Sequence, residues 1–420
     1  MSLSNSYSNL RPTLLLDFSN GQALDPRITF ARASTARFYD GETVAKAEEN
    51  LLTQSNPVTG TNWSNSGFTI TTNAGVAPDG TSTATKLVPV TDNVAHSTFQ
   101  VATAAGSNVQ SVFVKADGYT KVALRESQTG AYYVSFDLTG SGSVIEQSSA
   151  TGTITALANS WFRISMVGSI TGTTRWSIYV LAPAYTTGQP AAFAGDGTSG
   201  VLVWGAQLEN RTAVAAYTPT TTAPVTNYVP QLMTAASGQP RIDFDPITRV
   251  CRGLLIEESR QNLLQRSEEF DNAAWTKSAA SAQANATVAP DGALTADALV
   301  EDTTTAEHWV QQASTVVTAT AYTYSLYAKA AGRTKFRMRE VGATNATVVL
   351  DLTTGTVSST SGGGTGTITN VGNGWYRCTL TFTSSGTTAA LRVNLLDESF
   401  NASYAGNGYS GVFIWGAQLE

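Results

Sequence analysis

The chain has 420 residues, a formal net charge of −6 at pH 7, and only 13% charged residues. A mildly acidic chain presents no basic field that would attract nucleic acid, so a nucleic-acid partner is not expected. Hydrophobic residues make up 42%, as in ordinary globular proteins, and no apolar run approaches the length that spans a bilayer, so membrane insertion is not expected either.

The two cysteines, Cys251 and Cys378, lie outside any metal-binding spacing, and they provide no disulfide framework. The opening residues MSLSNSYSNLRP lack the basic start and apolar middle of a secretory signal. We therefore expect synthesis and assembly in a cytoplasm.

A long duplication organises the chain, because a segment that begins at Asn50 recurs from Asn262. Each copy is long enough to bury its own core, which predicts two similar domains at residues 50–218 and 262–420. Duplication favours a repeated binding or structural surface over a single elaborated catalytic site. The copies share NLL at 50–52 and 262–264, tryptophan at 63 and 275, APDG at 77–80 and 289–292, and WGAQLE at 204–209 and 415–420.

Short runs rich in Val, Thr, Ile, Tyr and Phe alternate with Gly, Asn and Asp clusters throughout, which predicts an all-β fold of many antiparallel strands. Outside the copies, LDPRITFARAST at 24–35 loosely resembles the Asp-Pro segment at 242–259. We interpret residues 1–49 and 219–261 as a split, β-rich anchoring unit, with PTTTAPVTNYVP at 219–230 as an extended linker.

Strand alternation predicts which side chains share a face. In 375–382, Cys378 falls with apolar residues and is predicted to be a packing residue, as is its counterpart Ile164. The opposite face carries Trp375 with Arg377, and the first copy repeats the pair as Trp161 with Arg163.

Neighbouring strands add further aromatic and basic residues to this predicted face. If the strands share one sheet, the rings suit the C–H faces of sugars and the bases suit hydroxyls or carboxylates. The alternative is that long basic stems cover an outer sheet and the tryptophans pack under a loop. The glycan-binding candidates are Phe113, Lys115, Arg125, Trp161, Arg163, Tyr327, Lys329, Arg337, Arg339, Trp375 and Arg377.

Several motifs together resemble tailed-phage virion proteins with head-spike or fibre domains: LDPRITFARAST, RIDFDP, CRGLLIEESRQNLL, NGWYR and WGAQLE. The two copies resemble jelly-roll carbohydrate-binding domains, and the resemblance covers nearly the whole chain. It implies two jelly-roll β-sandwiches, exposure on a virion, and an N-terminal unit that docks to the head or tail. It also implies host surface polysaccharide and other virion proteins as partners, in a homo-oligomer such as a trimer.

The two WGAQLE strands end differently, since the first continues into NRTAVAAYTPT and the second stops at Glu420. Alternation predicts Trp204, Ala206 and Leu208 as one buried set, as it does Phe413, Trp415, Ala417 and Leu419 in the second copy. Glu209 and Glu420 face the other way. They are weak candidates for a structural calcium site, and no other cofactor is expected.

Residue types that could support catalysis have simpler interpretations. His96 and His308 occupy the same repeat position and are predicted to be hydrogen-bonded strand histidines. Asp79 and Asp291 lie in APDG, and Asp137 and Asp351 in DLT, which are turn sequences. We expect a non-enzymatic attachment protein. The alternative is a purely structural decoration or connector, and a glycan depolymerase ranks third.

Overall fold

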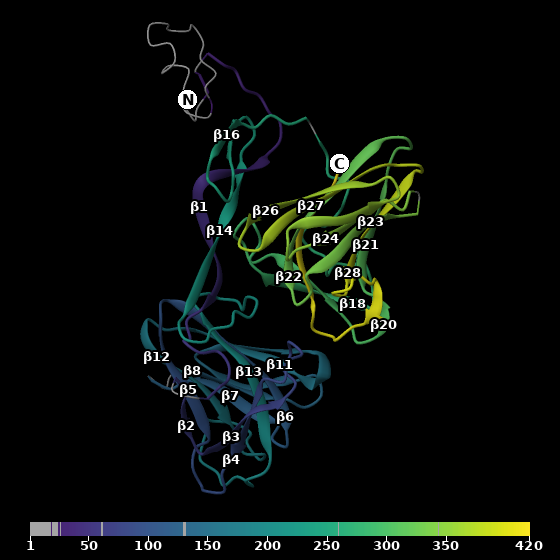
Figure 1. Cartoon of the computed structure of the whole chain (residues 1–420). Coiled ribbons are helices and arrows are strands. Elements are labelled where there is room, and N and C mark those ends of the chain that lie inside the picture. The colour runs from purple at the N-terminus through teal and green to yellow at the C-terminus, as the bar shows by residue number, and fades with distance from the viewer. Residues whose placement is uncertain are drawn as a thin grey trace. The chain divides into compact units, whose positions relative to one another are not determined.

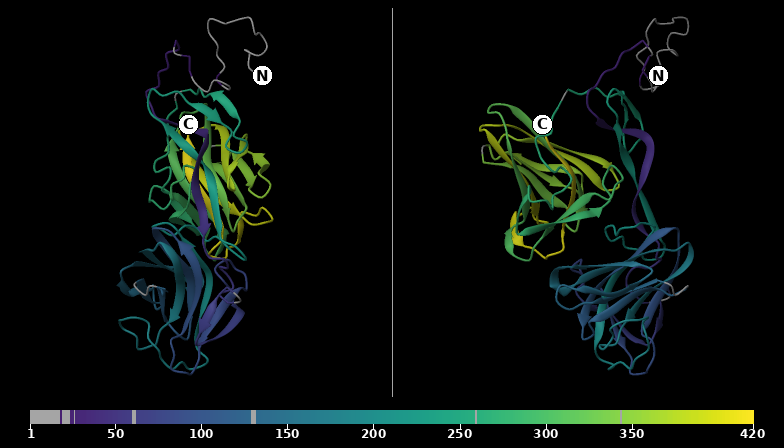
Figure 2. Two further views of the ribbon diagram at one scale, coloured as in Figure 1. Left: turned by 90° about the vertical axis from the view of Figure 1, so that its left-hand side faces the viewer. Right: turned by 180° about the vertical axis from the view of Figure 1, so that it is seen from behind.

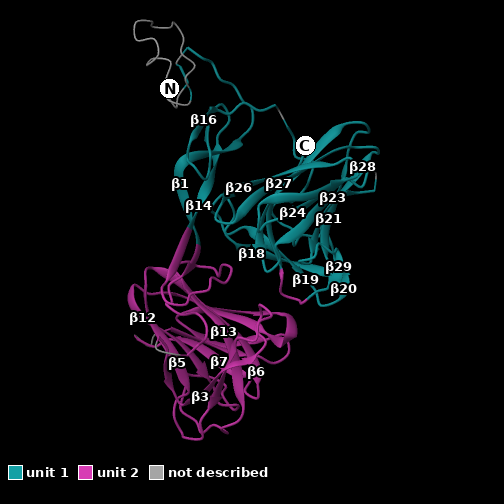
Figure 3. Cartoon of the chain, viewed as in Figure 1, with its two compact units in different colours: residues 1–47, 228–406, 411–420 teal, residues 48–227, 407–410 magenta. Residues whose placement is uncertain are grey.

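The computed structural model describes Phe18, residues 24–25, 27–59, 62–128, 132–258, 260–342 and 344–420. The fold is all-β, as predicted, with one 3-10 turn at Ala158–Ser160 as an exception. Two compact units are present, residues 48–227 with 407–410, and residues 1–47, 228–406 and 411–420 (Figure 3). Part of the predicted anchoring segment 1–49 lies outside the described residues. In the described part of the chain, no helix is both long and apolar enough to traverse a membrane.

The first repeat forms a jelly-roll-like β-sandwich of two six-stranded antiparallel sheets (Figure 1). The β6–β13 sheet has the order β10 (Thr151–Ala156), β11 (Phe162–Ser169), β6 (Ser107–Asp117), β13 (Gly200–Glu209), β4 (Ala84–Pro89) and β3 (Phe68–Gly75). The β7–β12 sheet has the order β2 (Ser64–Ser66), β5 (Ser97–Ala104), β12 (Gly172–Val180), β7 (Lys121–Glu126), β8 (Tyr132–Asp137) and β9 (Ser143–Ser148).

The second repeat forms a sandwich with the same arrangement. The β22–β30 sheet has the order β18 (Ala280–Thr287), β19 (Ala296–Glu301), β30 (Gly411–Leu419), β22 (Ala321–Ala331), β27 (Trp375–Thr383) and β26 (Thr365–Gly372). The β23–β28 sheet has the order β17 (Thr276–Ser278), β21 (Trp309–Thr315), β28 (Thr388–Leu396), β23 (Lys335–Val341), β24 (Thr347–Asp351) and β25 (Thr356–Ser361). A small pair joins β20 (Thr305–Glu307) to β29 (Ser403–Ala405).

The two pieces of the predicted split unit meet in a two-stranded ribbon, β1 (Ala36–Asn50) with β14 (Val225–Ala235). A hairpin of β15 (Ile242–Phe244) and β16 (Cys251–Leu254) follows. The ribbon lies beside the second sandwich (Figure 2), and its Tyr39, Val229 and Leu232 join Trp375 and Trp415 in one apolar cluster. The ribbon therefore covers part of the β22–β30 sheet.

The core between the sheets of the second sandwich confirms the predicted alternation in 375–382. Cys378, Leu380 and Phe382 point inward and pack with residues such as Phe336 and Met338 of the facing sheet. Burial raises the pKa of the Cys378 thiol, as expected for a packing residue in an apolar core.

The residues that recur between the copies hold the sandwiches closed. Asn50 Nδ2 donates to Ala206 O at 3.0 Å, and Asn262 Nδ2 donates to Ala417 O at the same distance. Each asparagine Oδ1 accepts a backbone N–H from the last strand, that of Leu208 or Leu419. NLL and WGAQLE recur together because the asparagine joins the start of each repeat to its final strand.

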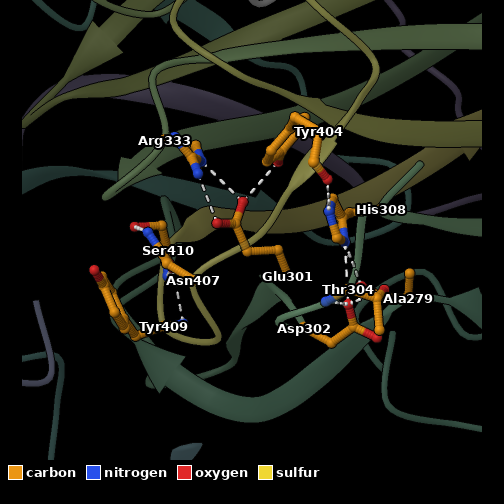
Figure 4. A network of polar contacts seen from close by, with 10 residues as sticks. All are labelled: Ala279, Glu301, Asp302, Thr304, His308, Arg333, Tyr404, Asn407, Tyr409 and Ser410. Carbon is orange, nitrogen blue, oxygen red and sulfur yellow. Dashed lines mark hydrogen bonds and ion pairs between the residues drawn. The ribbon is translucent and has the colours of Figure 1, made fainter. Parts of the chain in front are cut away.

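Each histidine connects two backbone segments just before a strand of its sandwich. His96 Nδ1 lies 2.6 Å from Gly67 O, and its Nε2 lies 2.9 Å from Phe193 O. His308 Nδ1 lies 2.5 Å from Ala279 O, and its Nε2 lies 3.2 Å from Tyr404 O (Figure 4). Both rings are buried, so the prediction of hydrogen-bonded histidines is confirmed.

A buried polar network beside His308 connects three segments of the second sandwich (Figure 4). Glu301 is fully packed and accepts hydrogen bonds from Arg333 Nη2 at 2.6 Å, Arg333 Nε at 2.8 Å and Tyr404 Oη at 2.6 Å. The bidentate contact with Glu301 raises the pKa of Arg333. The charge of Glu301 is therefore compensated inside the protein.

Replacing Arg333 with Met should leave the Glu301 carboxylate buried without its cation. We expect the free energy of unfolding, measured by urea denaturation, to fall by about 3–5 kcal/mol. Arg266→Met removes an exposed ion pair to Glu269 and should cost less than about 1 kcal/mol. Equal losses for the two variants would show that the Glu301 network is not a stabilising element.

Candidate functional site

The predicted aromatic and basic residues do not lie on one sheet. Arg163 is directly opposite Phe113 on β11 and β6, and Arg377 is directly opposite Tyr327 on β27 and β22. Arg125, Arg337 and Arg339 instead lie on β7 and β23, in the other sheet of each sandwich. Strand order depends on long crossovers, which alternation within single strands cannot reveal.

A glycine-centred bulge corrects the predicted alternation of WGAQLE. The register of β13 shifts between Trp204 and Gln207, and Gly205 adopts φ +63°. Ala206 and Leu208 enter the core as predicted, but Trp204 turns outward and packs with Phe113. Gly416 has the same φ, and Trp415 likewise joins the outer cluster rather than the core.

In the first sandwich, the chain itself covers this outward aromatic cluster. Trp161 is only 2% exposed, and the Tyr217 ring lies 4.5 Å from that of Trp204. Arg163 sits 5.0 Å from the Phe113 ring centre and donates through Nη1 to Ala215 O at 2.8 Å. Burial lowers the pKa of Arg163 to about 10.

In the second sandwich, the ribbon covers the equivalent cluster. Trp375 is fully buried, and the Arg37 guanidinium lies 5.6 Å from the Trp415 ring centre. Arg377 remains exposed on the same strand as Trp375. Lys115 and Lys329, at equivalent positions of the two copies, are partly exposed.

The indole N–H groups of these tryptophans are already hydrogen-bonded within the protein. Trp161 donates to Val76 O at 3.1 Å, and Trp375 donates to Val288 O at 3.2 Å. Trp204 and Trp415 donate to the hydroxyls of Thr83 and Thr295. The partners match between the copies, so the repeated tryptophans hold the scaffold and do not form an open sugar-binding face.

The calcium candidates are not gathered with other acidic ligands. Glu209 is buried beside Arg211 and accepts the Ala215 N–H, and burial raises the pKa of its carboxyl. Glu420 exchanges backbone hydrogen bonds with Thr323. Within the described ranges, no group of three or more His, Cys, Asp or Glu side chains is arranged to hold a metal ion.

The repeated aspartates cap turns, as predicted. Asp79 Oδ1 accepts the Thr81 N–H and Asp291 Oδ1 accepts the Ala293 N–H, both at 3.0 Å. Asp137 accepts from Thr139 at 3.0 Å, and Asp351 accepts from Thr353 at 2.8 Å, in the same local pattern.

The outer face of the β23–β28 sheet carries a different aromatic and basic group. All tryptophans lie within the described residues, and Trp309 on β21 is the one that is not buried. Its indole N–H has no acceptor in the described part of the chain. The register places Trp309, Asn394 and Arg337 in one row across three strands.

The neighbouring row contains Gln311, Arg392 and Arg339. Arg392 stacks on Trp309, with 3.9 Å between its guanidinium carbon and the ring centre, and donates to Gln311 Oε1 at 2.9 Å. We name this group, completed by Glu307, the Trp309 face. It contains Glu307, Trp309, Gln311, Arg337, Arg339, Arg392 and Asn394.

The first sandwich does not repeat Trp309, Arg337 and Arg392 at the equivalent positions, although Arg175 lies over Phe99 on the matching sheet, with 5.2 Å between the guanidinium carbon and the ring centre. His96 and Gln100 match His308 and Gln312, so the strand registers place Ser97, Ala123 and Ser177 where the second copy has Trp309, Arg337 and Arg392. Arg125 matches Arg339 but donates to Gln189 of the loop after β12. Tyr185 and Leu181 of that loop also pack over Ala123 and Tyr179.

Sequence reasoning found Arg337 and Arg339 but missed Trp309, Arg392 and Glu307. The predicted face was built on residues that recur in both copies. The recurring tryptophans are buried and stabilise the fold of each sandwich. The available signal was a difference between copies, AHSTFQ at 95–100 against EHWVQQ at 307–312. Where duplicated domains share a fold, departures from the repeat are the positions able to carry a separate function.

No protein-family model matches the chain, and no curated protein matches it. The solved structures that resemble it do so weakly. The secreted serine protease VesC from Vibrio cholerae has 6% identity over 77% of this chain and a TM-score of 0.18, and the match spans only 50% of the protease. Oxalate decarboxylase from Bacillus subtilis has 6% identity over 96% of this chain and 80% of its own, with a TM-score of 0.12. The Momordica charantia 7S globulin has 6% identity, coverage of 80% and 84%, and a TM-score of 0.14.

Burial of Trp375 leads to a direct stability test. Trp375→Ala should lower the free energy of unfolding by about 3–5 kcal/mol, because it opens a cavity under the ribbon. Arg377→Ala changes an exposed residue two positions along β27 and should stay within about 0.5 kcal/mol of the parent protein. A small effect of Trp375→Ala in chemical denaturation would contradict the covered-face description.

Proposed function

We propose that this protein is a non-enzymatic attachment protein that binds a host surface saccharide on the Trp309 face of its second sandwich. The observation that carries the proposal is the partly exposed Trp309, which stacks with Arg392 and shares its sheet face with Arg337 and Arg339, while every other tryptophan is buried. An accessible indole offers apolar area to a sugar ring, and guanidinium groups donate to its oxygens.

The resemblance of the sequence motifs to virion fibre and head-spike proteins supports placement of the attachment protein on a phage particle. In that setting the split N-terminal unit docks to the particle, and a trimer presents several copies of the Trp309 face. Several weak saccharide contacts on one particle then act together through effective concentration.

A structural connector is the second candidate function, and the covered faces favour it. Both repeats bury their shared tryptophans under their own chain, which indicates that much of the duplicated surface serves assembly of the protein itself. A depolymerase is less well supported. Glu307 is held by Arg337 at 3.2 Å and Arg392 at 3.6 Å, and the repeated aspartates cap turns.

The test is a binding assay of the full chain on host-envelope polysaccharides, with reducing-end release monitored in the same samples. Trp309→Ser introduces the residue that the first sandwich carries at the equivalent position, Ser97, so the fold should accept it. We expect the affinity to fall about tenfold, as for loss of a central aromatic anchor.

Arg377→Ala serves as the matched control, because it removes an exposed arginine from the other sheet. The control should bind as the parent protein does. Loss of binding in Arg377→Ala but not in Trp309→Ser would assign the saccharide to the ribbon-covered face. Absence of binding by folded protein would favour the connector, and release of reducing ends would favour the depolymerase.

A further inference from the structure

Two arginines of the Trp309 face stand directly opposite each other. The register pairs Arg339 on β23 with Arg392 on β28, and both lie on the outer side of the sheet. Like charges in directly opposed positions of an antiparallel pair repel each other and destabilise the sheet. At the equivalent positions of the first sandwich, Arg125 is opposite Ser177, so the shared fold does not require the pair.

The acidic groups around the pair do not balance its charge. Glu307 is shared between Arg337 and Arg392, and it also accepts from Asn394 Nδ2 at 3.2 Å. Arg339 donates to Asn345 Oδ1 at 2.8 Å, a neutral acceptor. Three guanidinium groups on the Trp309 face thus have one carboxylate among them.

The nearby lysine is neutralised separately. Lys335 Nζ lies 2.8 Å from Glu398 Oε2 and 3.9 Å from Asp351 Oδ2. The excess of positive charge therefore lies at Arg339 and Arg392 and not over the whole sheet, in a chain whose net charge is −6. An anion at this point would relieve the repulsion between the arginines.

Neighbouring side chains hold both guanidinium groups in position before any ligand arrives. Arg392 is fixed by stacking on Trp309 and by its bond to Gln311, and its side chain is only 15% exposed. Burial lowers the pKa of Arg392, and the charges of Arg339 and Arg337 act in the same direction. Donors that are fixed and partly desolvated lose little freedom when they bind an anion.

We propose that Arg339 and Arg392 bind the carboxylate or sulfate group of an acidic saccharide whose ring contacts Trp309. This inference rests on the proposed function and names the class of saccharide that the face selects. Carboxylate and sulfate oxygens both match the planar fork of guanidinium donors, which makes several charge-assisted hydrogen bonds at once. The first sandwich lacks the pair and should show no such preference.

The experiment measures binding of the full chain to immobilised dextran, carboxymethyl-dextran and dextran sulfate, which share a backbone and differ in charge. We expect at least one charged polymer to bind about tenfold tighter than dextran, with the advantage falling as salt is added. A preference between the two charged polymers identifies the bound group as carboxylate or sulfate.

Two variants and a control separate a defined site from general attraction. Arg392→Ser, which copies Ser177, and Arg339→Gln, which keeps the Trp309–Arg392 stack, should each remove most of the advantage of the charged polymers. Arg377→Ser removes an exposed arginine on the other sheet and should retain it. Equal losses in all three variants, or equal binding of all three polymers, would overturn the proposal.

The same data distinguish failure of this inference from failure of the proposed function. If a host saccharide binds through Trp309, and charged and neutral saccharides bind with equal affinity, the anion site is refuted and the attachment function stands. If charged dextrans bind through Arg339 and Arg392 while no host saccharide binds, the anion site stands and attachment is refuted.

Discussion

The glycine-centred bulge in the last strand of each sandwich determines which surfaces of this protein are available. Gly205 and Gly416, each at φ +63°, rotate the preceding tryptophan out of the core and onto the outer side of its sheet. An indole placed there, beside further aromatic rings, creates a large apolar patch that is unfavourable in water. The chain covers the patch with Tyr217 in one repeat and with the β1–β14 ribbon in the other.

These two coverings occupy one outer face of each sandwich, and the proposed saccharide site lies on the opposite sheet. There the two copies have diverged. The first packs the loop after β12 over Ala123 and Tyr179, whereas the second carries Trp309 and three arginines. Duplication has thus kept one surface for assembly of the protein and altered the other.

The sequence was sufficient to predict the all-β class, the repeat, and the inward set around Cys378, because these depend on local alternation and turn residues. It grouped Arg163 and Phe113 on one predicted face without predicting their pairing, and the two residues lie directly opposite each other on adjacent strands. It placed Arg125 and Arg337 on the wrong sheet, because strand order is set by long-range crossovers. It assigned Trp204 to the core, although a glycine within a strand pattern is a known sign of a bulge. Trp309 was not among the predicted site residues, because the first copy has Ser97 at the equivalent position and the prediction relied on residues shared by both copies.

The proposed function depends on one contrast, in which the tryptophans shared by the repeats are buried and Trp309 is partly exposed. Hydroxyl-radical footprinting of the full chain, with oxidation measured for each tryptophan by mass spectrometry, measures this contrast. We expect rapid oxidation of Trp309 and protection of Trp161 and Trp375, with Trp309 becoming protected when a saccharide binds. Rapid oxidation of Trp161 and Trp375 in the folded protein would contradict the covered-face description, because the predicted aromatic face would then be open to ligands.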